Sequence, residues 1–414
     1  MPSGGVRHEV AGAMTSFLLL TLLAQNVEQR GFIENRTLLF PQDAPNDSAH
    51  AVNQSLLRWE GSYKPSSWLK FNGSFDARLD THRQVDRQLR LNLDDRATQR
   101  PALALRQFSA TIHKSKVTAE LGRQIIRWGK TDIITPTDRF APRDYLSSVV
   151  DSDFLGVTAA RVTVAGASNS FDMVYQPWFT PSRTPLLNQR WTALPPELNG
   201  VAIADAGARY PGRGQYGARW NHLASGYEYS LSYFDGCNTL PQFDAQFDPR
   251  TAAVRAQRFY PNMRMYGGDT AIQLPWVTVK GEAGYFTTST PGSQDYILYV
   301  VQVERQVKEW SLIGGYAGEA VTAGANNPLR FTPDRGFAKS FVGRAALTID
   351  VNRSLVVESA VRSGGSFMRF EYSRALGEHW RVTPGIAWIR GSANDFLGQY
   401  HRNSYLSLAV RYSF

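Results

Sequence analysis

The sequence predicts an all-β chain that closes into a transmembrane antiparallel barrel of about 16–18 strands around a polar lumen. Three observations support this prediction. In the last ten residues every second side chain is apolar, this period-two pattern recurs along the chain, and short connections alternate with long ones. The chain has 414 residues and no linker rich in Pro, Gly or Ser, so it exceeds the usual size of one soluble core. A barrel escapes this limit, because each strand contacts only its neighbours and lipid.

Residues 1–24 have the pattern of a secretory signal peptide. The basic Arg7 precedes an apolar run from Ala11 to Ala24, which is shorter than a membrane-spanning helix. We therefore expect export of the chain, with residues 25–414 forming the barrel.

The first clear hairpin is expected over residues 57–63 and 69–80, joined by a turn at residues 64–66. In the second strand one face is apolar and the other carries polar and charged side chains. The apolar members are Leu69, Phe71, Gly73, Phe75, Ala77 and Leu79, and the polar members are Lys70, Asn72, Ser74, Asp76, Arg78 and Asp80.

Connections of two lengths follow one another along the chain. Short turns are expected near residues 114–116, 165–169, 223–226, 274–276, 307–309, 350–353 and 375–379. Long connections are expected at residues 41–51, 81–100, 129–154, 177–213, 236–261 and 320–336. Short periplasmic turns and longer extracellular loops are typical of outer-membrane barrels.

The later strands keep the same alternation, over residues 277–285, 341–349 and 380–388. Pro384 interrupts the last of these and predicts a bulge, because proline cannot donate to the ladder. Aromatic residues near strand ends predict an interfacial girdle. They are Trp59, Trp68, Trp276, Trp310, Trp380 and Tyr412.

The last strand, residues 405–414, places Leu406, Leu408, Val410, Tyr412 and Phe414 on one face. It resembles the closing strand of a Gram-negative outer-membrane β-barrel. In that class of protein, a terminal Phe preceded by alternating aromatic residues is the signal that the barrel-assembly machinery recognises. The resemblance implies this role for Phe414 and Tyr412, and it implies the cell outer membrane as the location.

The polar face of the strands carries charges of both signs, which a dry core could not hold at reasonable cost. We expect these side chains to line a water-filled lumen, either as a structural network or as the wall that sets selectivity. The predicted wall residues are Arg58, Lys70, Arg78, Arg219, Arg344, Arg369, Arg381, Arg411, Glu282 and Glu371.

The most distinctive stretch runs from Gly122 to Tyr145. Its Gly122-Arg123-Gln124 followed by Trp128-Gly129 resembles a motif in a poorly characterised family of proteobacterial outer-membrane barrels and, more distantly, exopolysaccharide-export barrels of the alginate type. In general porins, which the chain resembles in architecture, the third loop folds inward and narrows the pore. By this resemblance the predicted constriction comprises Lys130, Asp132, Asp138, Arg139, Arg143 and Asp144, or these residues form a surface loop held by its own ion pairs.

Other function classes find little support. No nucleophile elbow, phosphate loop or metal-ligand spacing is present, so we expect no catalytic residues, no metal and no cofactor. The net charge of +9 is spread along the chain, which argues against nucleic acid as a partner. The one cysteine, Cys237, cannot form an intrachain disulfide and is expected in a loop or at a strand end.

The expected function is passive diffusion of small hydrophilic solutes through a porin-like channel. Its expected partners are the solute, membrane lipid with lipopolysaccharide, and the assembly machinery. Two alternatives remain open, export of an exopolysaccharide and a closed barrel that acts as an anchor or adhesin.

Overall fold

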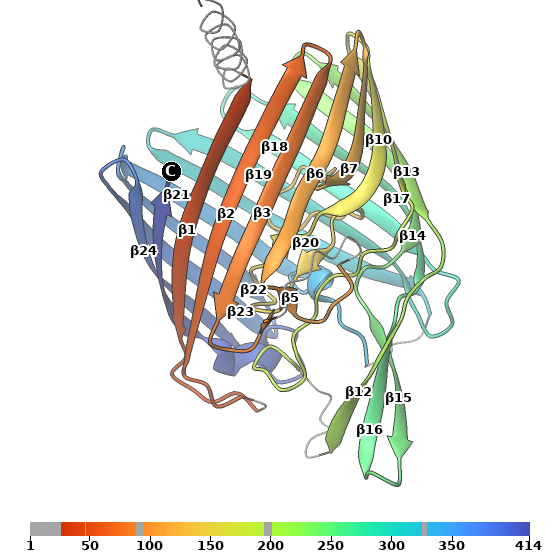
Figure 1. Ribbon diagram of the computed structural model, residues 1–414, viewed down its shortest axis with the longest axis vertical. Helices are drawn as coiled ribbons and strands as arrows, with labels where there is room; N and C mark the ends of the chain where they lie inside the picture. The colour runs from red at the N-terminus through yellow and green to blue at the C-terminus, as the bar shows by residue number, and fades with distance from the viewer. Residues whose placement is uncertain (1–25, 46, 88–94, 194–200, 325–328) are drawn as a thin grey trace, which may run out of the picture.

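The barrel closes because its first and last strands pair with each other (Figure 1). The computed structural model describes residues 26–45, 47–87, 95–193, 201–324 and 329–414. Its main element is an 18-stranded sheet of antiparallel neighbours, in which β1 pairs with both β2 and β25. This confirms the predicted fold class. The predicted signal peptide lies outside the described residues.

The barrel strands follow chain order around the wall. They are β1 (Val27–Leu39), β2 (Ala51–Ser66), β3 (Leu69–Asp80), β6 (Leu103–Lys114), β7 (Val117–Gln124), β10 (Val157–Ala165), β11 (Asn169–Gln176), β13 (Gln215–Ala224), β14 (Tyr227–Cys237), β17 (Asn262–Gln273), β18 (Thr278–Thr287), β19 (Asp295–Val307), β20 (Trp310–Ala323), β21 (Ser340–Asp350), β22 (Arg353–Arg362), β23 (Gly365–Leu376), β24 (Trp380–Gly391) and β25 (Tyr405–Ser413).

The two faces of the wall differ as the alternation predicts. On β3, Phe71, Phe75 and Leu79 are exposed on the outside of the barrel, whereas Ser74 and Asp76 are buried inside. Apolar side chains face outward on strand after strand, so the outer surface is apolar. The inner surface is polar except on part of the wall from β10 to β20, where inward apolar side chains are buried. A surface of this kind fits lipid on the outside and water on the inside.

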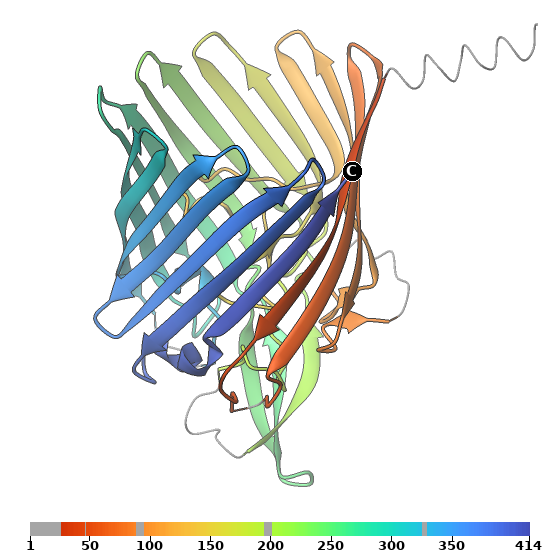
Figure 2. The same cartoon turned by 90° about the vertical axis from the view of Figure 1, so that its left-hand side faces the viewer.

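The two rims also differ, because short turns join the strands at one rim, whereas most connections at the other rim are longer loops (Figure 2). Most predicted turns are confirmed, but the first is displaced. The β2–β3 turn consists of Ser67 and Trp68, since β2 continues through residues 64–66 with a register irregularity after Tyr63. The predicted bulge at Pro384 is wrong. The cross-strand pairs Glu371–Gly385 and Arg374–Val382 lie on either side of Pro384 and keep the same register, so neither strand contains an extra residue here.

Aromatic side chains gather at the rim of short turns. Trp68 and Trp276 lie in turns, Trp310 and Trp380 begin strands, and the Trp380 ring packs 5.0 Å from that of Tyr412. The prediction for Trp59 is wrong, because this residue lies within β2 and packs against Phe75 on the neighbouring strand.

The terminal residue takes part in closing the barrel. Phe414 and Gly31 exchange two backbone hydrogen bonds of 2.9 Å, one in each direction. A Cβ on Gly31 would lie 2.5 Å from the Phe414 ring, so glycine leaves the space that the aromatic side chain occupies. The C-terminus is therefore fixed to β1 by backbone and side chain together.

Smaller elements lie in the long loops. A three-stranded arm of β12 (Ala202–Arg209), β15 (Gln242–Asp248) and β16 (Ala253–Phe259) projects beyond the long-loop rim (Figure 1). Two-residue strands form the pairs β4 (Val85–Asp86) with β5 (Arg100–Pro101) and β8 (Arg143–Asp144) with β9 (Asp153–Phe154). Short 3-10 helices span Pro333–Arg335 and Gly398–Asn403.

Cys237 is the buried last residue of β14, at a strand end as expected. Among the helices of the described residues, none has both the length and the apolar character needed to cross a membrane.

The outward face gives a first prediction. Val301 lies at the middle of β19 with 52% of its surface exposed, and Val307 lies on the same face at the turn end. In a lipid bilayer, Val301→Arg should lower the free energy of unfolding by about 2–4 kcal/mol, and Val307→Arg by about 0–1 kcal/mol. Urea titration of protein refolded in vesicles measures both values. Equal costs at the two depths would contradict a membrane-spanning wall.

Candidate functional site

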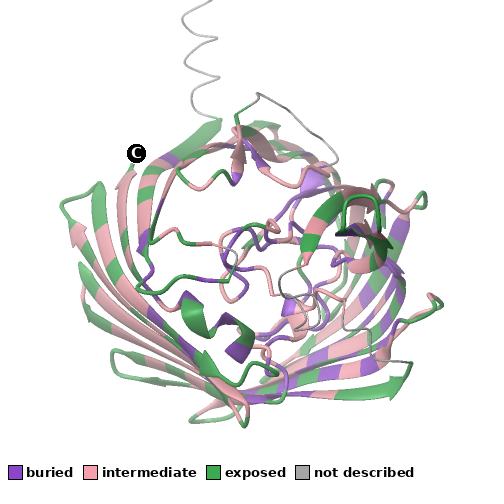
Figure 3. Cartoon of the chain, turned by 90° about the horizontal axis from the view of Figure 1, so that it is seen from below, coloured by how far each residue is buried: buried purple, intermediate pink, exposed green. Residues whose placement is uncertain are grey.

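Loop segments lie inside the barrel (Figure 3), and the loop between β7 and β10, residues 125–156, packs against the inner face of the wall. Its Ile126, Trp128, Ile134 and Phe140 are at most 5% exposed and belong to one apolar cluster with inward side chains of the wall. That part of the wall spans β10 to β20, and the Phe140 ring lies 5.0 Å from that of Phe234 on β14. Burial of these four side chains holds the loop in the lumen, since each contributes roughly 1.5–3 kcal/mol.

A single carboxylate fixes the loop to the wall. Glu282, on the inner face of β18, is 2% exposed. Its Oε2 accepts hydrogen bonds from the backbone N–H of Lys130 (2.8 Å) and from the N–H and hydroxyl of Thr131 (3.0 and 2.8 Å). Its Oε1 accepts hydrogen bonds from the N–H and hydroxyl of Thr137, both at 2.8 Å. Hydrogen bonds to a charged group are each worth about 1.5–3 kcal/mol, so Glu282 is a strong anchor.

The distinctive sequence motif forms the start of this loop. Gly122 has a φ of +119° and lies against the backbone of β6, where a Cβ would meet the Phe108 carbonyl oxygen at 2.3 Å. The Trp128 indole donates to Asp172 at 2.8 Å. Asp138 accepts from the backbone N–H groups of Trp128 (2.6 Å) and Gly129 (2.7 Å). The motif therefore turns the chain from the wall into the lumen.

A buried ion-pair network joins three long loops. Arg183 bridges the carboxylates of Asp95 and Asp144, while Arg123 binds Asp95 at 2.8 Å and Arg100 binds Asp144 at 2.8 Å. All five side chains are less than 10% exposed. Removing one member of such a network leaves an uncompensated charge and costs about 3–5 kcal/mol.

The network also determines how Asp144 responds to pH. Burial raises the pKa of its carboxyl, but Arg100 and Arg183 outweigh burial and hold that pKa well below its usual range. Because the pKa is depressed in the folded chain, the contribution to stability is complete above the unfolded value of about 3.9. It is lost only as pH falls through the lower folded value, so the Asp144 carboxylate is charged at neutral pH.

The far end of the loop faces a different part of the wall, made of β1, β2, β3 and β23. Asp151 contacts Arg369 at 2.8 Å and Arg36 at 3.5 Å. Asp153 lies 3.7 Å from Arg58 and 3.8 Å from Arg78. Most of these side chains are partly exposed, so they face water inside the barrel.

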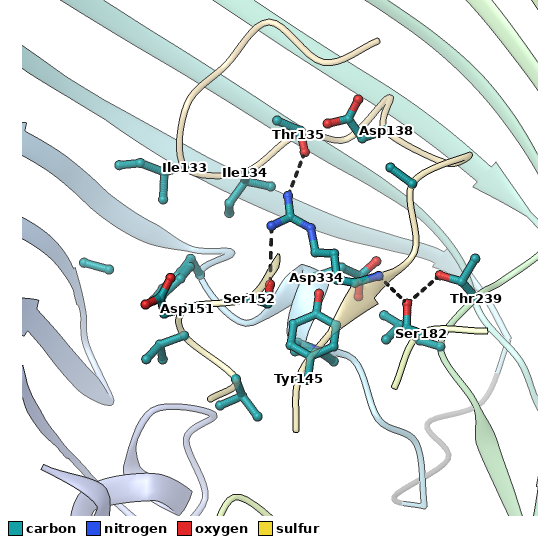
Figure 4. Close-up of a pocket in the computed structure, with 18 of the residues that line it drawn as sticks. Ile133, Ile134, Thr135, Asp138, Tyr145, Asp151, Ser152, Ser182, Thr239 and Asp334 are labelled. Carbon is teal, nitrogen blue, oxygen red and sulfur yellow. Dashed lines mark hydrogen bonds between the residues drawn. The ribbon is translucent and has the colours of Figure 1, made fainter. Parts of the chain in front are cut away.

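Two cavities of about 220 Å³ each flank this end of the loop, and Asp151 lines both. The first lies between the loop, β22 and β23 (Figure 4). There the Arg143 guanidinium donates to Thr135 (3.3 Å) and Ser152 (3.5 Å), and its backbone N–H donates to Ser182. The second lies between the loop and the first three strands, and its arginines are Arg36, Arg58, Arg78, Arg100 and Arg411.

The predicted wall residues all occupy inward positions of their strands, where several form ion pairs. Arg58 binds Asp76 at 2.7 Å, Arg219 binds Asp269 at 2.9 Å, and Arg411 binds Glu34 at 2.6 Å. Arg344 and Arg369 both bind Glu358, and Glu371 lies 4.0 Å from Arg369. Lys70 and Arg381 lie on the inward face near the short turns.

The predicted constriction residues bind different partners. Asp138 and Asp144 are buried and hold the loop together, and Arg139 binds Asp334 of the β20–β21 loop at 3.2 Å. Lys130 binds Glu228 on β14, and Asp132 lies 3.6 Å from Lys280 on β18. Four of the six, Asp132, Asp138, Arg139 and Arg143, line the first cavity, and Asp144 lines the second.

Sequence reasoning missed two features of this site. It did not include Asp151 and Asp153 in the predicted constriction, although they contact arginines of the wall. It also assigned Glu282 to the wall without its loop partners. The sequence did contain a signal that the loop is buried, because a solvated loop would not carry so many large apolar residues. These residues are Ile126, Trp128, Ile134 and Phe140.

Comparison with known proteins identifies the fold. OccAB4 of Acinetobacter baumannii aligns with a TM-score of 0.55 and 9% identity, covering 94% of this chain and 98% of that chain. OccK3 (OpdO) of Pseudomonas aeruginosa aligns with a TM-score of 0.52 and 10% identity, covering 96% and 99%. No protein-family model and no curated protein sequence matches. The chain therefore shares the barrel fold of these proteins.

The Glu282 anchor gives the second prediction. Glu282→Gln keeps the side-chain shape but removes the charge and turns one acceptor into a donor that faces N–H groups. The amides of Thr131 and Thr137 should exchange hydrogen about 10-fold faster or more, which corresponds to the loss of one charge-assisted hydrogen bond. Hydrogen-exchange mass spectrometry of the refolded barrel measures this rate.

Glu304→Gln is the matched control, because Glu304 lies on the neighbouring strand β19 and contacts Lys280 and Gln302 rather than the N–H groups of Thr131 or Thr137. It should leave the exchange of the Thr131 and Thr137 amides unchanged. Unaltered exchange in Glu282→Gln would show that the apolar cluster alone holds the loop.

Proposed function

We propose that the chain is a porin-like channel of the outer membrane, through which small hydrophilic solutes diffuse passively. The apolar outer face, the charged inner face and the closed ladder support this proposal. The terminal Phe414 and the aromatic girdle fit the expected assembly machinery and membrane lipid as partners. The fold shared with OccAB4 and OccK3, two barrels of comparable length, is consistent with it.

The single observation that carries the proposal is the polar cavity between the loop and β1, β2, β3 and β25. It is lined by arginines from four strands of the barrel wall, by Arg100 of β5, and by Asp151 and Asp153 of the loop. Its wall offers charged and hydroxyl groups that replace the hydration of a small polar solute. The loop narrows the lumen here because its other end is fixed to Glu282 on the opposite wall.

This arrangement refines the predicted constriction. We assign the solute-facing positions to Arg143, Asp151 and Asp153 of the loop and to Arg36, Arg58, Arg78, Arg369 and Arg411 of the wall. Asp138, Asp144 and Arg139 keep the loop in place. The motif from Gly122 to Gly129, which prompted the comparison with alginate-type export, has a structural role in this assignment.

The third prediction concerns the loop. Deleting residues 131–151 should raise the single-channel conductance in planar bilayers, since the deletion removes the segment that crosses the lumen. Removing residues 249–251 at the tip of the arm is the control and should leave conductance unchanged, because the arm projects outside the barrel. Heat-modifiable migration verifies that each variant folds.

Two results would overturn parts of the proposal. Equal conductance with and without the loop would remove its role as a constriction. A folded chain that never conducts, with or without the loop, would indicate the closed structural barrel, and secretion lost on gene deletion would indicate exopolysaccharide export.

The fourth prediction concerns ion selectivity. Replacing Asp151 and Asp153 with Asn removes negative charge beside Arg36, Arg58, Arg78 and Arg369, so the lumen should favour anions more than the wild type does. The reversal potential in a salt gradient measures this change, and it should shrink at high ionic strength. Asp350→Asn, in the exposed β21–β22 turn, is the control. A reversal potential that does not move would place the permeation path elsewhere.

A further inference from the structure

Two arginines and one aspartate form a cluster on the outer face of the barrel at the long-loop rim. Arg264 is near the start of β17, Asp235 is near the end of β14, and the two are paired across the strands. Their inward neighbours Phe234 and Met265 are buried against the loop in the lumen, so Asp235 and Arg264 point away from it. Arg213 reaches the same place from the residues that precede β13.

The aspartate orients both guanidinium groups. Asp235 is 3% exposed, and its two oxygens accept from Arg213 Nη1 at 2.7 Å and from Arg264 Nε at 2.8 Å. The arginine side chains remain 43% and 61% exposed. One carboxylate therefore binds two guanidinium groups, and the cluster keeps a net positive charge. The N–H groups of the arginines that do not bind Asp235 remain partly exposed on the outer face.

A row of tyrosines marks the level of this cluster relative to a membrane. Tyr175, Tyr216, Tyr266 and Tyr285 point outward from β11, β13, β17 and β18, each between 39% and 54% exposed. Tyr233 links them, with its ring 6.3 Å from that of Tyr216 and 5.4 Å from that of Tyr266. Outward tyrosines at a barrel rim lie at the level of the lipid head groups.

The arginines lie immediately beyond these rings toward the long loops. Arg264 precedes Tyr266 on the same face of β17, and its partner on β18 is Thr287, which follows Tyr285. A guanidinium at this level meets the phosphate groups of the surrounding lipid rather than its acyl chains. Arginine also matches phosphate geometrically, because it donates two parallel N–H groups.

We propose that Arg213 and Arg264 bind the phosphate of a phosphorylated glycolipid in the leaflet on the long-loop side. This inference rests on the proposed placement in the outer membrane. The tyrosine row supplies the apolar surface for the acyl chains, and Asp235 fixes the two guanidinium groups before the lipid arrives. Preorganisation of this kind favours binding, because less side-chain freedom is lost.

The test is native mass spectrometry of the refolded full-length mature chain with purified lipid A. The double variant Arg213→Ala with Arg264→Ala should bind lipid A about 10-fold more weakly or worse than the wild type does, as expected for the loss of at least one charge-assisted hydrogen bond. The single variant Arg264→Gln, which leaves Arg213 on Asp235, should show a smaller loss and guards against misfolding of the double variant.

The matched control is Arg353→Ala. Arg353 is 48% exposed and binds Asp350 at 2.6 Å, but it belongs to the turn at the opposite rim. It should leave binding of lipid A unchanged. Equal affinity in all variants would overturn the proposal, as would inorganic phosphate displacing lipid A at equal concentration, because that would indicate a site for a free anion.

Conductance in phospholipid bilayers without lipid A separates this inference from the proposed channel. Conducting variants that bind lipid A as the wild type does would overturn the lipid site alone. A wild type that binds lipid A through these arginines but never conducts would overturn the channel alone.

Discussion

The structure depends on the pairing of its first strand with its last. An open sheet of this length would expose a row of unpaired N–H and C=O groups at each edge, and a bilayer offers no water to satisfy them. Pairing β1 with β25 removes both edges, and the reciprocal hydrogen bonds of Gly31 and Phe414 extend that pairing to the last residue. Once the ladder is closed, each strand can have only one face toward the lumen and one toward the surroundings.

Closure at this size creates a second constraint, because the side chains of the wall cannot fill so wide an interior. The chain fills part of it with its own loops. Loop 125–156 brings a set of apolar side chains to one side of the lumen, where the wall supplies Phe234, Met265 and Leu298 to pack against them. On the opposite side, where β1, β2, β3 and β23 present arginines, the loop contributes the carboxylates of Asp151 and Asp153 beside a second apolar cluster that includes Val149 and Phe367. The second cavity lies on that side.

The parts of the fold that the sequence predicts are those governed by local rules. Alternation with period two is visible in 69–80 and 405–414, and it directly states which side chains face outward. The turn at Ser67–Trp68 was displaced because residues 64–66, with Pro65, resemble a turn but continue the strand past an irregularity. The arm of β12, β15 and β16 was not anticipated, since its strands come from two separate loops and pair only in three dimensions.

The candidate site was harder to predict because its key contacts join distant residues. Glu282 resembled every other inward charge in the sequence, and nothing local indicates that Thr131 and Thr137 would meet it across about 150 positions. The loop illustrates why charge alone is a poor guide to a solute-facing residue. Asp138 and Asp151 belong to one loop, but Asp138 accepts hydrogen bonds from backbone N–H groups of the loop, whereas Asp151 forms ion pairs with arginines of the wall. A carboxylate whose oxygens accept hydrogen bonds from its own loop fixes the position of that loop. A carboxylate paired with partly exposed arginines leaves those arginines accessible to a passing solute. Asp151 lines both cavities. A movement of the loop would therefore also change the charge that both cavities present to a solute.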